Sequence, residues 1–377
     1  MILARRAAIV LPVLLAGCAA VGQHGAPRLV VADGCRPADP AEARIRYYTE
    51  RLAAAPGLHP MYTQLGLAYL DRARDTHDPI WLARAREAEA TALALQENFE
   101  SQMAMAAIQN YAHRFADAIA WCERAAAASV NGPWIRDPAV TAALVEAYIG
   151  LGRTDEAGAL VSPPSSARPD FHAAVAYGKW LAATGRTSEA VEAFGTAAAL
   201  ARSQQVPALA AWAETAAAGA LLDARRLADA PAHLAAAEAL DPCAVSVRVH
   251  RAELEELEGR HGAALAAYEA ILRDNPDPVV AAHAFTLAQR RGDRRAAARH
   301  FAAAERGFQR AIAAGEVYTL GPLARLYADA GTNLERAVAL AEENLRWKRD
   351  REALATAAFV KARATAAVHL NVTETSR

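Results

Sequence analysis

Residues 230–276 read APAHLAAAEALDPCAVSVRVHRAELEELEGRHGAALAAYEAILRDNP and decide the fold. Ala230 and Ala264 are 34 residues apart (264 − 230), and Pro242 and Pro276 have the same separation (276 − 242). A fixed period near 34 residues is typical of arrays of helix–turn–helix units, in which each unit packs on its neighbours. The stretch therefore predicts one unit of a longer helical array.

The same alanine recurs along the chain at one position of the second helix of each unit. It is found at Ala85, Ala118, Ala157, Ala190, Ala230, Ala264, Ala297 and Ala337. The steps between these alanines are 33, 39, 33, 40, 34, 33 and 40 residues, so the three longest carry an insertion of about six. Because a small side chain lets two helices approach closely, we interpret the alanines as packing anchors of about eight units.

Glycine and proline mark the ends of the helices. A glycine precedes several of the alanines by five or six residues, at Gly152, Gly185, Gly259, Gly292 and Gly331. Glycine ends a helix by taking a left-handed conformation, and proline cannot continue one. Pro169, Pro242 and Pro276 each lie twelve residues after an alanine anchor. Since β-branched runs of period two are scarce, we expect an all-α protein.

The first complete unit carries the pattern of a known family. Tyr62, Leu65, Gly66 and Tyr69 have the spacing of the first helix of a tetratricopeptide repeat, which the chain resembles here. The resemblance implies a right-handed α-solenoid of about eight units, with a half-unit at each end. It also implies a concave groove that binds peptides or partner helices. The repeat register places these residues on that groove: Thr63, Leu67, Glu146, Lys179, Trp212, Thr215, Glu253, Thr286 and Arg325.

The first eighteen residues resemble the leader of a bacterial lipoprotein. Arg5–Arg6 precede a short apolar stretch, Ala7–Leu15, which is too short to span a bilayer. Leu15–Cys18 (LAGC) resembles a lipobox, which implies cleavage before Cys18 and acylation of its thiol. With Ala19 next, it also implies an outer-membrane anchor facing the periplasm, or a cell-membrane surface in a cell with one membrane. An ordinary cleaved signal peptide and an uncleaved anchor remain alternatives.

These patterns divide the chain into five segments. They are a signal peptide (1–17), a Gly- and Pro-containing tether (18–38), an N-terminal capping helix (39–57), the repeat array (58–349), and a terminal helix with a frayed tail (350–377).

Several irregular stretches interrupt the array. Pro163-Pro164 falls inside a second helix, and it indicates either a decayed repeat or a hinge or docking loop. Residues 71–80 lengthen the first hairpin, and residues 131–134 and 203–207 are expected insertions. Residues 294–314 predict one long helix.

Composition and motifs argue against several functions. The formal charge of −1, from 41 basic and 42 acidic residues, does not favour nucleic-acid binding. The cysteines Cys35, Cys122 and Cys243 form no C-x-x-C pair. We expect Cys122 to be a buried core thiol. Cys35 and Cys243 either form a disulfide, which an exported protein allows, or remain unpaired. Trp134 and Trp212 are either interface anchors or packing residues.

The sequence favours an interaction scaffold over an enzyme. No metalloprotease, serine-hydrolase or phosphate-loop motif occurs, and the segments outside the repeats are too short for a catalytic domain. We expect no catalytic residue, cofactor, metal or small-molecule substrate. The expected function is a lipid-anchored scaffold that binds partner proteins or peptides in the bacterial cell envelope. The alternatives are a periplasmic binder of peptides or unfolded chains, similar to a holdase, and a non-catalytic subunit of an envelope assembly or secretion complex.

Overall fold

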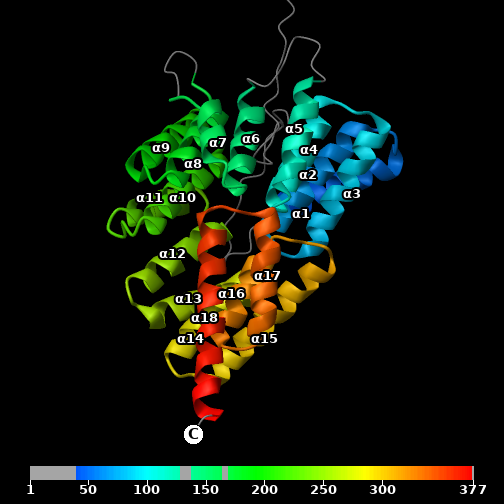
Figure 1. Cartoon of the computed structure of the whole chain (residues 1–377). Coiled ribbons are helices and arrows are strands. Elements are labelled where there is room, and N and C mark those ends of the chain that lie inside the picture. The colour runs from blue at the N-terminus through cyan, green and yellow to red at the C-terminus, as the bar shows by residue number, and fades with distance from the viewer. Residues whose placement is uncertain (1–39, 128–136, 164–168, 376–377) are drawn as a thin grey trace, which may run out of the picture.

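A computed structural model describes residues 40–127, 137–163 and 169–375. Within these ranges the chain forms eighteen α-helices and no β-strand, as Figure 1 shows. The predicted leader, its Cys18, Cys35 and the tether lie outside the described residues, as do Trp134 and Pro164. No helix in the described ranges is both long enough and apolar enough to cross a bilayer.

Sixteen of the helices form eight consecutive pairs. The first helices of the pairs are α2 (His59–Thr76), α4 (Phe99–Tyr111), α6 (Pro138–Gly150), α8 (Phe171–Ala183), α10 (Pro207–Asp223), α12 (Val245–Leu257), α14 (Pro278–Arg290) and α16 (Leu320–Ala330). The second helices are α3 (Pro79–Leu95), α5 (Phe115–Ala127), α7 (Thr154–Leu160), α9 (Thr187–Ser203), α11 (Ala230–Leu240), α13 (His261–Asp274), α15 (Arg294–Ala313) and α17 (Leu334–Trp347). Single helices lie at the two ends, α1 (Pro40–Ala54) against α2 and α18 (Arg351–Thr375) against α16 and α17. The predicted all-α array of eight pairs with a half-unit at each end is confirmed.

Aspartate and asparagine caps set where many helices begin. The Asp137 side chain accepts hydrogen bonds from the backbone of Ala139 and Val140, and Pro138 occupies the first helical position of α6. The cap satisfies amide groups that have no partner within the helix, and proline tolerates that position because it has no amide hydrogen. The same device starts α3, α4, α8, α14 and α15, at Asp78, Asn98, Asp170, Asp277 and Asp293.

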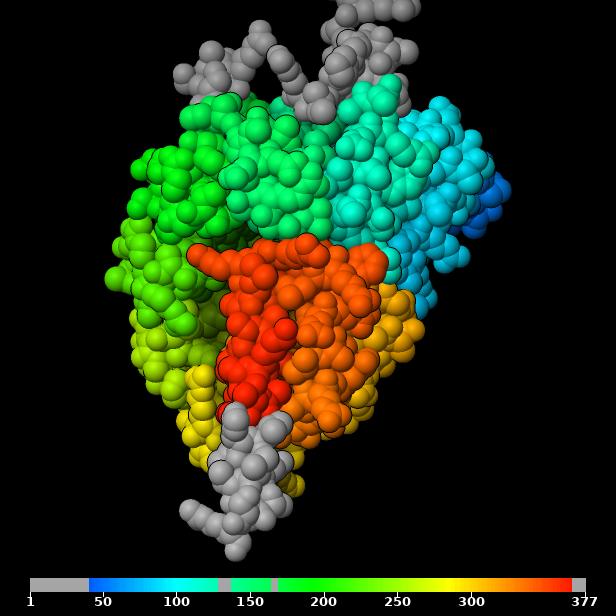
Figure 2. Space-filling view, viewed as in Figure 1, coloured from blue at the N-terminus to red at the C-terminus, as the bar shows by residue number. Residues whose placement is uncertain are grey.

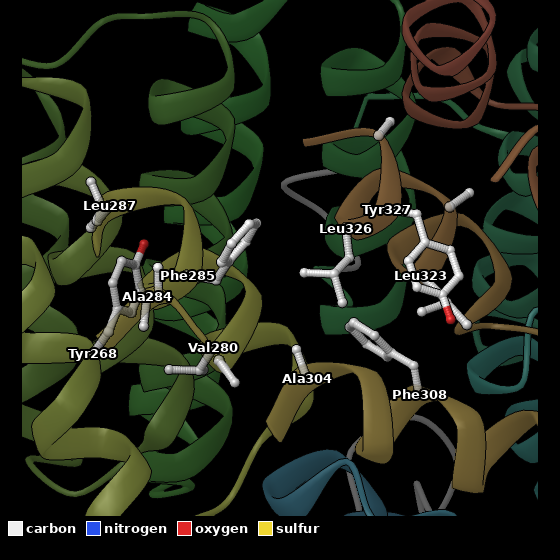
Figure 3. Packing of buried hydrophobic residues seen from close by; sticks show 14 of the residues in the cluster. Tyr268, Val280, Ala284, Phe285, Leu287, Ala304, Phe308, Leu323, Leu326 and Tyr327 are labelled. Atoms are coloured by element: carbon white, nitrogen blue, oxygen red, sulfur yellow. The ribbon is translucent and has the colours of Figure 1, made fainter. Parts of the chain in front are cut away.

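Small residues let the helices of a pair interlock. All eight alanine anchors are buried in second helices, at Ala85, Ala118, Ala157, Ala190, Ala230, Ala264, Ala297 and Ala337. Larger side chains fill the spaces between pairs. Figure 3 shows Phe308 of α15 and Leu326 of α16 pointing toward each other in the core of the last pairs, with Phe285 of α14 nearby. Burial of this kind drives the stacking of neighbouring units.

The turn inside each of the eight pairs contains at least one residue in the left-handed region. Gly152, Gly185, Gly259, Gly292 and Gly331 have φ between 67° and 81°, which confirms their predicted role as helix terminators. In three other pairs this conformation is taken by His77, His113 and Arg225, with φ of 49°, 58° and 59°. A side chain in this region costs about 1–2 kcal/mol, so these three turns carry backbone strain.

The irregular stretches differ in outcome. The long helix predicted at residues 294–314 is α15, whereas α7 has only seven residues and ends at Leu160, before Pro163. The lengthening at residues 71–80 is mostly helical, because α2 continues to Thr76. Likewise α9 extends to Ser203, which leaves only residues 204–206 between α9 and α10. Helix α18 continues to Thr375, through most of the segment expected to fray.

Candidate functional site

The array curves so far that its C-terminal pairs contact its N-terminal pairs. Three turns, inside the first, second and third pairs, meet three connections that follow α13, α15 and α17. The contacting residues are about 200 apart: His77 with Asp277 (200), Arg114 with Gly315 (201), and Gly150 with Arg349 (349 − 150 = 199). We call these the closing contacts.

The first closing contact joins the α2–α3 turn to the α13–α14 connection. His77 Nδ1 donates to Asp277 Oδ2 at 2.6 Å, and Asn275 Nδ2 donates to the carbonyl oxygen of Asp75 at 2.5 Å. Burial by itself lowers the pKa of His77, but the Asp277 hydrogen bond and nearby carboxylates outweigh burial and raise this pKa above its ordinary value. Asp277 is buried and also caps α14, so one carboxylate serves both the helix and the contact.

The second closing contact joins the first two pairs to the α15–α16 connection. The Arg86 guanidinium makes a two-pronged ion pair with Glu316, whose carboxylate is fully buried. Arg114 donates to the carbonyl oxygen of Gly315 at 2.9 Å, and the rings of Tyr111 and Tyr318 lie 5.8 Å apart. A bidentate guanidinium–carboxylate pair is among the strongest ionic contacts in proteins, and it fixes orientation as well as distance.

The third closing contact joins the third pair to the α17–α18 connection. The Arg349 amide donates to the carbonyl oxygen of Gly150 at 2.7 Å. A Cβ atom at Gly152 would lie 2.6 Å from the carbonyl oxygen of Arg349, so only glycine fits this turn. The Arg114 guanidinium lies 5.0 Å from the centre of the Trp347 ring, which ties the second pair to the same connection.

The curvature and the closing contacts enclose a central cavity of about 1390 Å³. Most of its lining residues lie on the first helices α4, α6, α8, α10, α12, α14 and α16 and on the start of α18. Drug-sized ligands occupy pockets of about 300–1,000 Å³, so this cavity has room for something larger. The concave surface predicted as a groove is therefore the wall of a partly enclosed space.

Oppositely charged side chains pair along the cavity wall. Lys179 Nζ lies 2.8 Å from Glu146 Oε2, and burial would raise the pKa of Glu146, but Lys179 lowers it below its ordinary value. Lys348 pairs with Asp350 at 3.3 Å and with Glu352 at 2.6 Å. The wall therefore carries both positive and negative side chains, and neither sign dominates.

A second polar group lies across the cavity on α12 and α14. Glu256 Oε2 accepts from His283 Nδ1 and from the Tyr268 hydroxyl, each at 3.3 Å, and Arg290 lies 3.7 Å away. Burial alone would raise the pKa of Glu256, and the His283 hydrogen bond brings it below its usual range. Burial alone lowers the pKa of His283, and Glu256 raises it above its ordinary value. Glu256, His283 and Arg290 therefore form a group of interacting ionisable side chains on the wall.

Four of the nine predicted groove residues line the cavity: Glu146, Lys179, Thr286 and Arg325. Trp212 is 39% exposed and lies beside them, with its ring 5.6 Å from Lys179 Nζ. Glu253 is half-buried on α12 and is not among the cavity-lining residues. Whether any of these residues contacts a partner stays a prediction.

The placement of three groove residues on the concave surface is wrong, because they are buried between helices. The Thr63 hydroxyl donates to Glu89 Oε1 at 3.2 Å and lies 3.0 Å from Ser101 Oγ. Leu67 belongs to the core of the first pairs, and the Thr215 hydroxyl donates to the backbone of Ala211. The repeat register correctly placed these residues on first helices. It did not show which side of each helix is covered by a neighbouring helix.

The residues that enclose the cavity were not found from the sequence. Those in the closing contacts are His77, Arg86, Arg114, Asp277, Glu316 and Tyr318. Another missed residue is His113, which lines the cavity and whose Nδ1 is buried without a hydrogen-bond partner in the described residues. Burial lowers the pKa of His113 to about 4, and the positive charge of Lys348 contributes to the shift. One signal was present, because His113 occupies the glycine position five residues before Ala118.

The described residues contain no group of three or more His, Cys, Asp or Glu side chains that could hold a metal. Cys122 is buried in the core of the first pairs, and burial raises its pKa to about 12. Cys243 is half-buried in the α11–α12 connection, and its pairing with Cys35 stays a prediction because Cys35 lies outside the described residues.

No protein-family model matches the chain, and a search of curated proteins found no match. Among solved structures, the chain is similar to a tetratricopeptide repeat protein from Parabacteroides merdae, with 12% identity, 70% of this chain and 98% of that chain covered, and a TM-score of 0.41. It is also similar to a Rap protein complexed with competence and sporulation factor (11% identity, 86% and 96% covered, TM-score 0.47). A third is pilF of Pseudomonas aeruginosa (18% identity, 66% and 90% covered, TM-score 0.34). The helical-repeat architecture is established by the chain's own paired helices.

Proposed function

We propose that the protein is a non-catalytic interaction scaffold that holds a polypeptide segment of a partner in its central cavity. The observation that carries the proposal is the cavity of about 1390 Å³, whose wall takes side chains from seven first helices and from α18. Arrays of this kind present one continuous concave surface to a ligand.

The chemistry of the wall fits a polypeptide better than a small ion. Ile149, Val279, Pro322 and Leu354 are half-buried or exposed apolar side chains that line the cavity between the ionic groups. The carboxylates and cations described above already have partners on the wall, so an inorganic ion would compete with contacts that exist. A polypeptide segment can place apolar side chains on the patches and exchange polar contacts with the charged pairs.

We further propose that the scaffold is anchored by lipid on Cys18 and works in the bacterial cell envelope, at the outer membrane. The support is Leu15–Cys18 and the apolar stretch before it. Acyl chains bind a bilayer by about 0.8 kcal/mol for each buried methylene, so several chains anchor a protein firmly. Mass spectrometry of the membrane-extracted N-terminus should show an acylated Cys18 as the first residue. A chain that retains residues 1–17, or an unmodified Cys18, would contradict the anchor.

Binding is tested with the full chain in mild detergent. The probe is fluorescein-labelled lactalbumin that has been reduced and carboxymethylated, so that it stays unfolded. Fluorescence anisotropy should show saturable binding, weakened about tenfold or more by Lys179→Glu, because that change breaks the pair with Glu146 and reverses a wall charge. Arg295→Ala is the matched control, since Arg295 is exposed on α15 outside the cavity. Equal loss in both variants, or no saturable binding, would contradict the proposal.

A further inference from the structure

The closing contacts seal the cavity along the first three pairs and stop there. At the third pair, a Cβ on Gly152 would meet the Arg349 backbone. At the equivalent turn of the fourth pair, a Cβ on Gly185 would meet nothing within 4 Å. In the described part of the chain, no hydrogen bond or ion pair joins the turns at Gly185 and Arg225 to a later connection. The cavity is therefore open on this side.

The opening lies between α18 and the ends of α8 and α10. A smaller pocket of about 240 Å³ is located there and shares Ala182, Ala220, Asp223 and Arg351 with the large cavity. Leu354, which also lines the cavity, is 53% exposed, an unusual environment for a leucine on the inner side of a helix. Figure 2 shows a hollow at the side of the red α18, between it and the green helices. We call this opening the mouth.

In the alternative route, the closing contacts separate and the array opens. This route requires buried ion pairs to break. Glu316 is 1% exposed and paired with Arg86, and Asp277 is 1% exposed and paired with His77. Separating such pairs leaves ionised groups poorly solvated until water reaches them, which is unfavourable. The two routes also admit different partners. An array that opens at its closing contacts can take in a folded domain, whereas the mouth is too narrow for one.

We infer that a partner reaches the cavity through the mouth while the closing contacts remain intact. The partner is then a chain end or an extended flexible segment, and a folded domain is excluded. This inference rests on the proposed function, since it describes how the same cavity is filled. Arg351 and Asp223 give the mouth charges of both signs, and the Arg351 charge opposes the rise that burial causes in the pKa of Asp223.

Entry by the mouth predicts a kinetic signature. Ala224, just after the end of α10, is exposed and lines the small pocket at the mouth but not the large cavity, so Ala224→Trp narrows the mouth. It should slow association and dissociation of the unfolded lactalbumin probe by a similar factor, roughly tenfold, with little change in Kd. Ala235→Trp, at an exposed position of α11 away from the cavity, is the matched control and should change neither rate. Both rates are measured by stopped-flow fluorescence on the full chain in detergent.

The same measurement tests the alternative route. Arg86→Ala weakens a closing contact without altering a residue of the cavity wall. If the mouth is the entrance, this variant keeps the wild-type association rate, and native disulfide-bonded lactalbumin does not bind. Faster association in Arg86→Ala, unchanged rates in Ala224→Trp, or binding of the folded lactalbumin would overturn the inference while leaving the proposed function standing. Absence of saturable binding in the wild type would contradict both the inference and the proposed function.

Discussion

Glu89 is a carboxyl group buried between α2, α3 and α4, and it makes the stability of the first pairs depend on pH. The side chain is 0% exposed, its Oε1 accepts from Thr63, and its Oε2 has no hydrogen-bond partner in the described residues. A Cβ at Gly66 would lie 3.1 Å from that oxygen, so the glycine makes room for the carboxyl group. Burial raises the pKa of Glu89 from 4.5 to about 8, despite hydrogen bonds from Thr63 and Ser101 that lower it.

The direction of the pH effect follows from this pKa. The folded state holds the proton of Glu89 more tightly than the unfolded chain, so the stabilising contribution is complete below about pH 4.5. It is lost as the pH rises toward 8 and does not change further above that value. With about 1.4 kcal/mol for each pH unit in this window, the free energy of unfolding should fall by roughly 2–3 kcal/mol between about pH 6 and about pH 9.

Glu89→Gln removes the titration and keeps the shape of the side chain. We expect the variant to be close to wild type at about pH 6 and more stable by roughly 2–3 kcal/mol at about pH 9. Urea denaturation followed by circular dichroism at several pH values measures the difference. Glu87→Gln is the matched control, since Glu87 is exposed on the same helix and should leave the pH profile unchanged. A difference between Glu89→Gln and wild type that is constant with pH would refute the reasoning.

Two further changes test the packing of the array. Ala264→Leu should cost about 1–3 kcal/mol of stability by overpacking a fully buried anchor, and an unchanged denaturation midpoint would show that the repeat register is wrong. Gly178→Ala should also destabilise by about 1–3 kcal/mol, because its Cβ would lie 2.9 Å from Cε1 of Phe194. Gly195→Ala, on a helix with nothing within 4 Å of the new Cβ, should instead stabilise by about 0.5–1 kcal/mol, and thermal unfolding of the two variants compares them directly.

The local rules of the array could be predicted from the sequence because they act within one repeat. An alanine such as Ala264 recurs at the closest helix approach, and a glycine such as Gly259 recurs where the chain must turn left-handed. Both requirements depend on residues fewer than about forty positions apart, so periodicity reveals them. The side of a helix that a neighbour covers is harder to predict. Thr63 was placed on the groove, yet α3 and α4 bury it beside Glu89.

The enclosure of the cavity could not be predicted, because it depends on small rotations between repeats that add up over six pairs. A slightly different rotation would bring different turns together or none, and no residue pattern within one repeat reports it. His77 and Asp277, 200 residues apart, are in hydrogen-bond contact only as the outcome of that sum.

The closing contacts nevertheless explain why some turns depart from glycine. The free turns of the fourth, sixth and seventh pairs keep Gly185, Gly259 and Gly292, whose added Cβ atoms would meet nothing within 4 Å. The contacted turns of the first and second pairs carry His77 and His113 in the same left-handed conformation, which is strained for histidine.

Both histidines make contacts that a glycine could not. His77 donates to Asp277 at 2.6 Å, and the ring of His113 lies 5.3 Å from Phe115 and 6.2 Å from Tyr318. These contacts offset the strain. A residue other than glycine in the left-handed turn is not by itself evidence of a closing contact. Arg225 has this conformation too, and its turn lies at the mouth. A histidine in a left-handed turn therefore indicates a closing contact only where a later segment of the array supplies a partner for it. Asp277 is that partner for His77, and Tyr318 is that partner for His113.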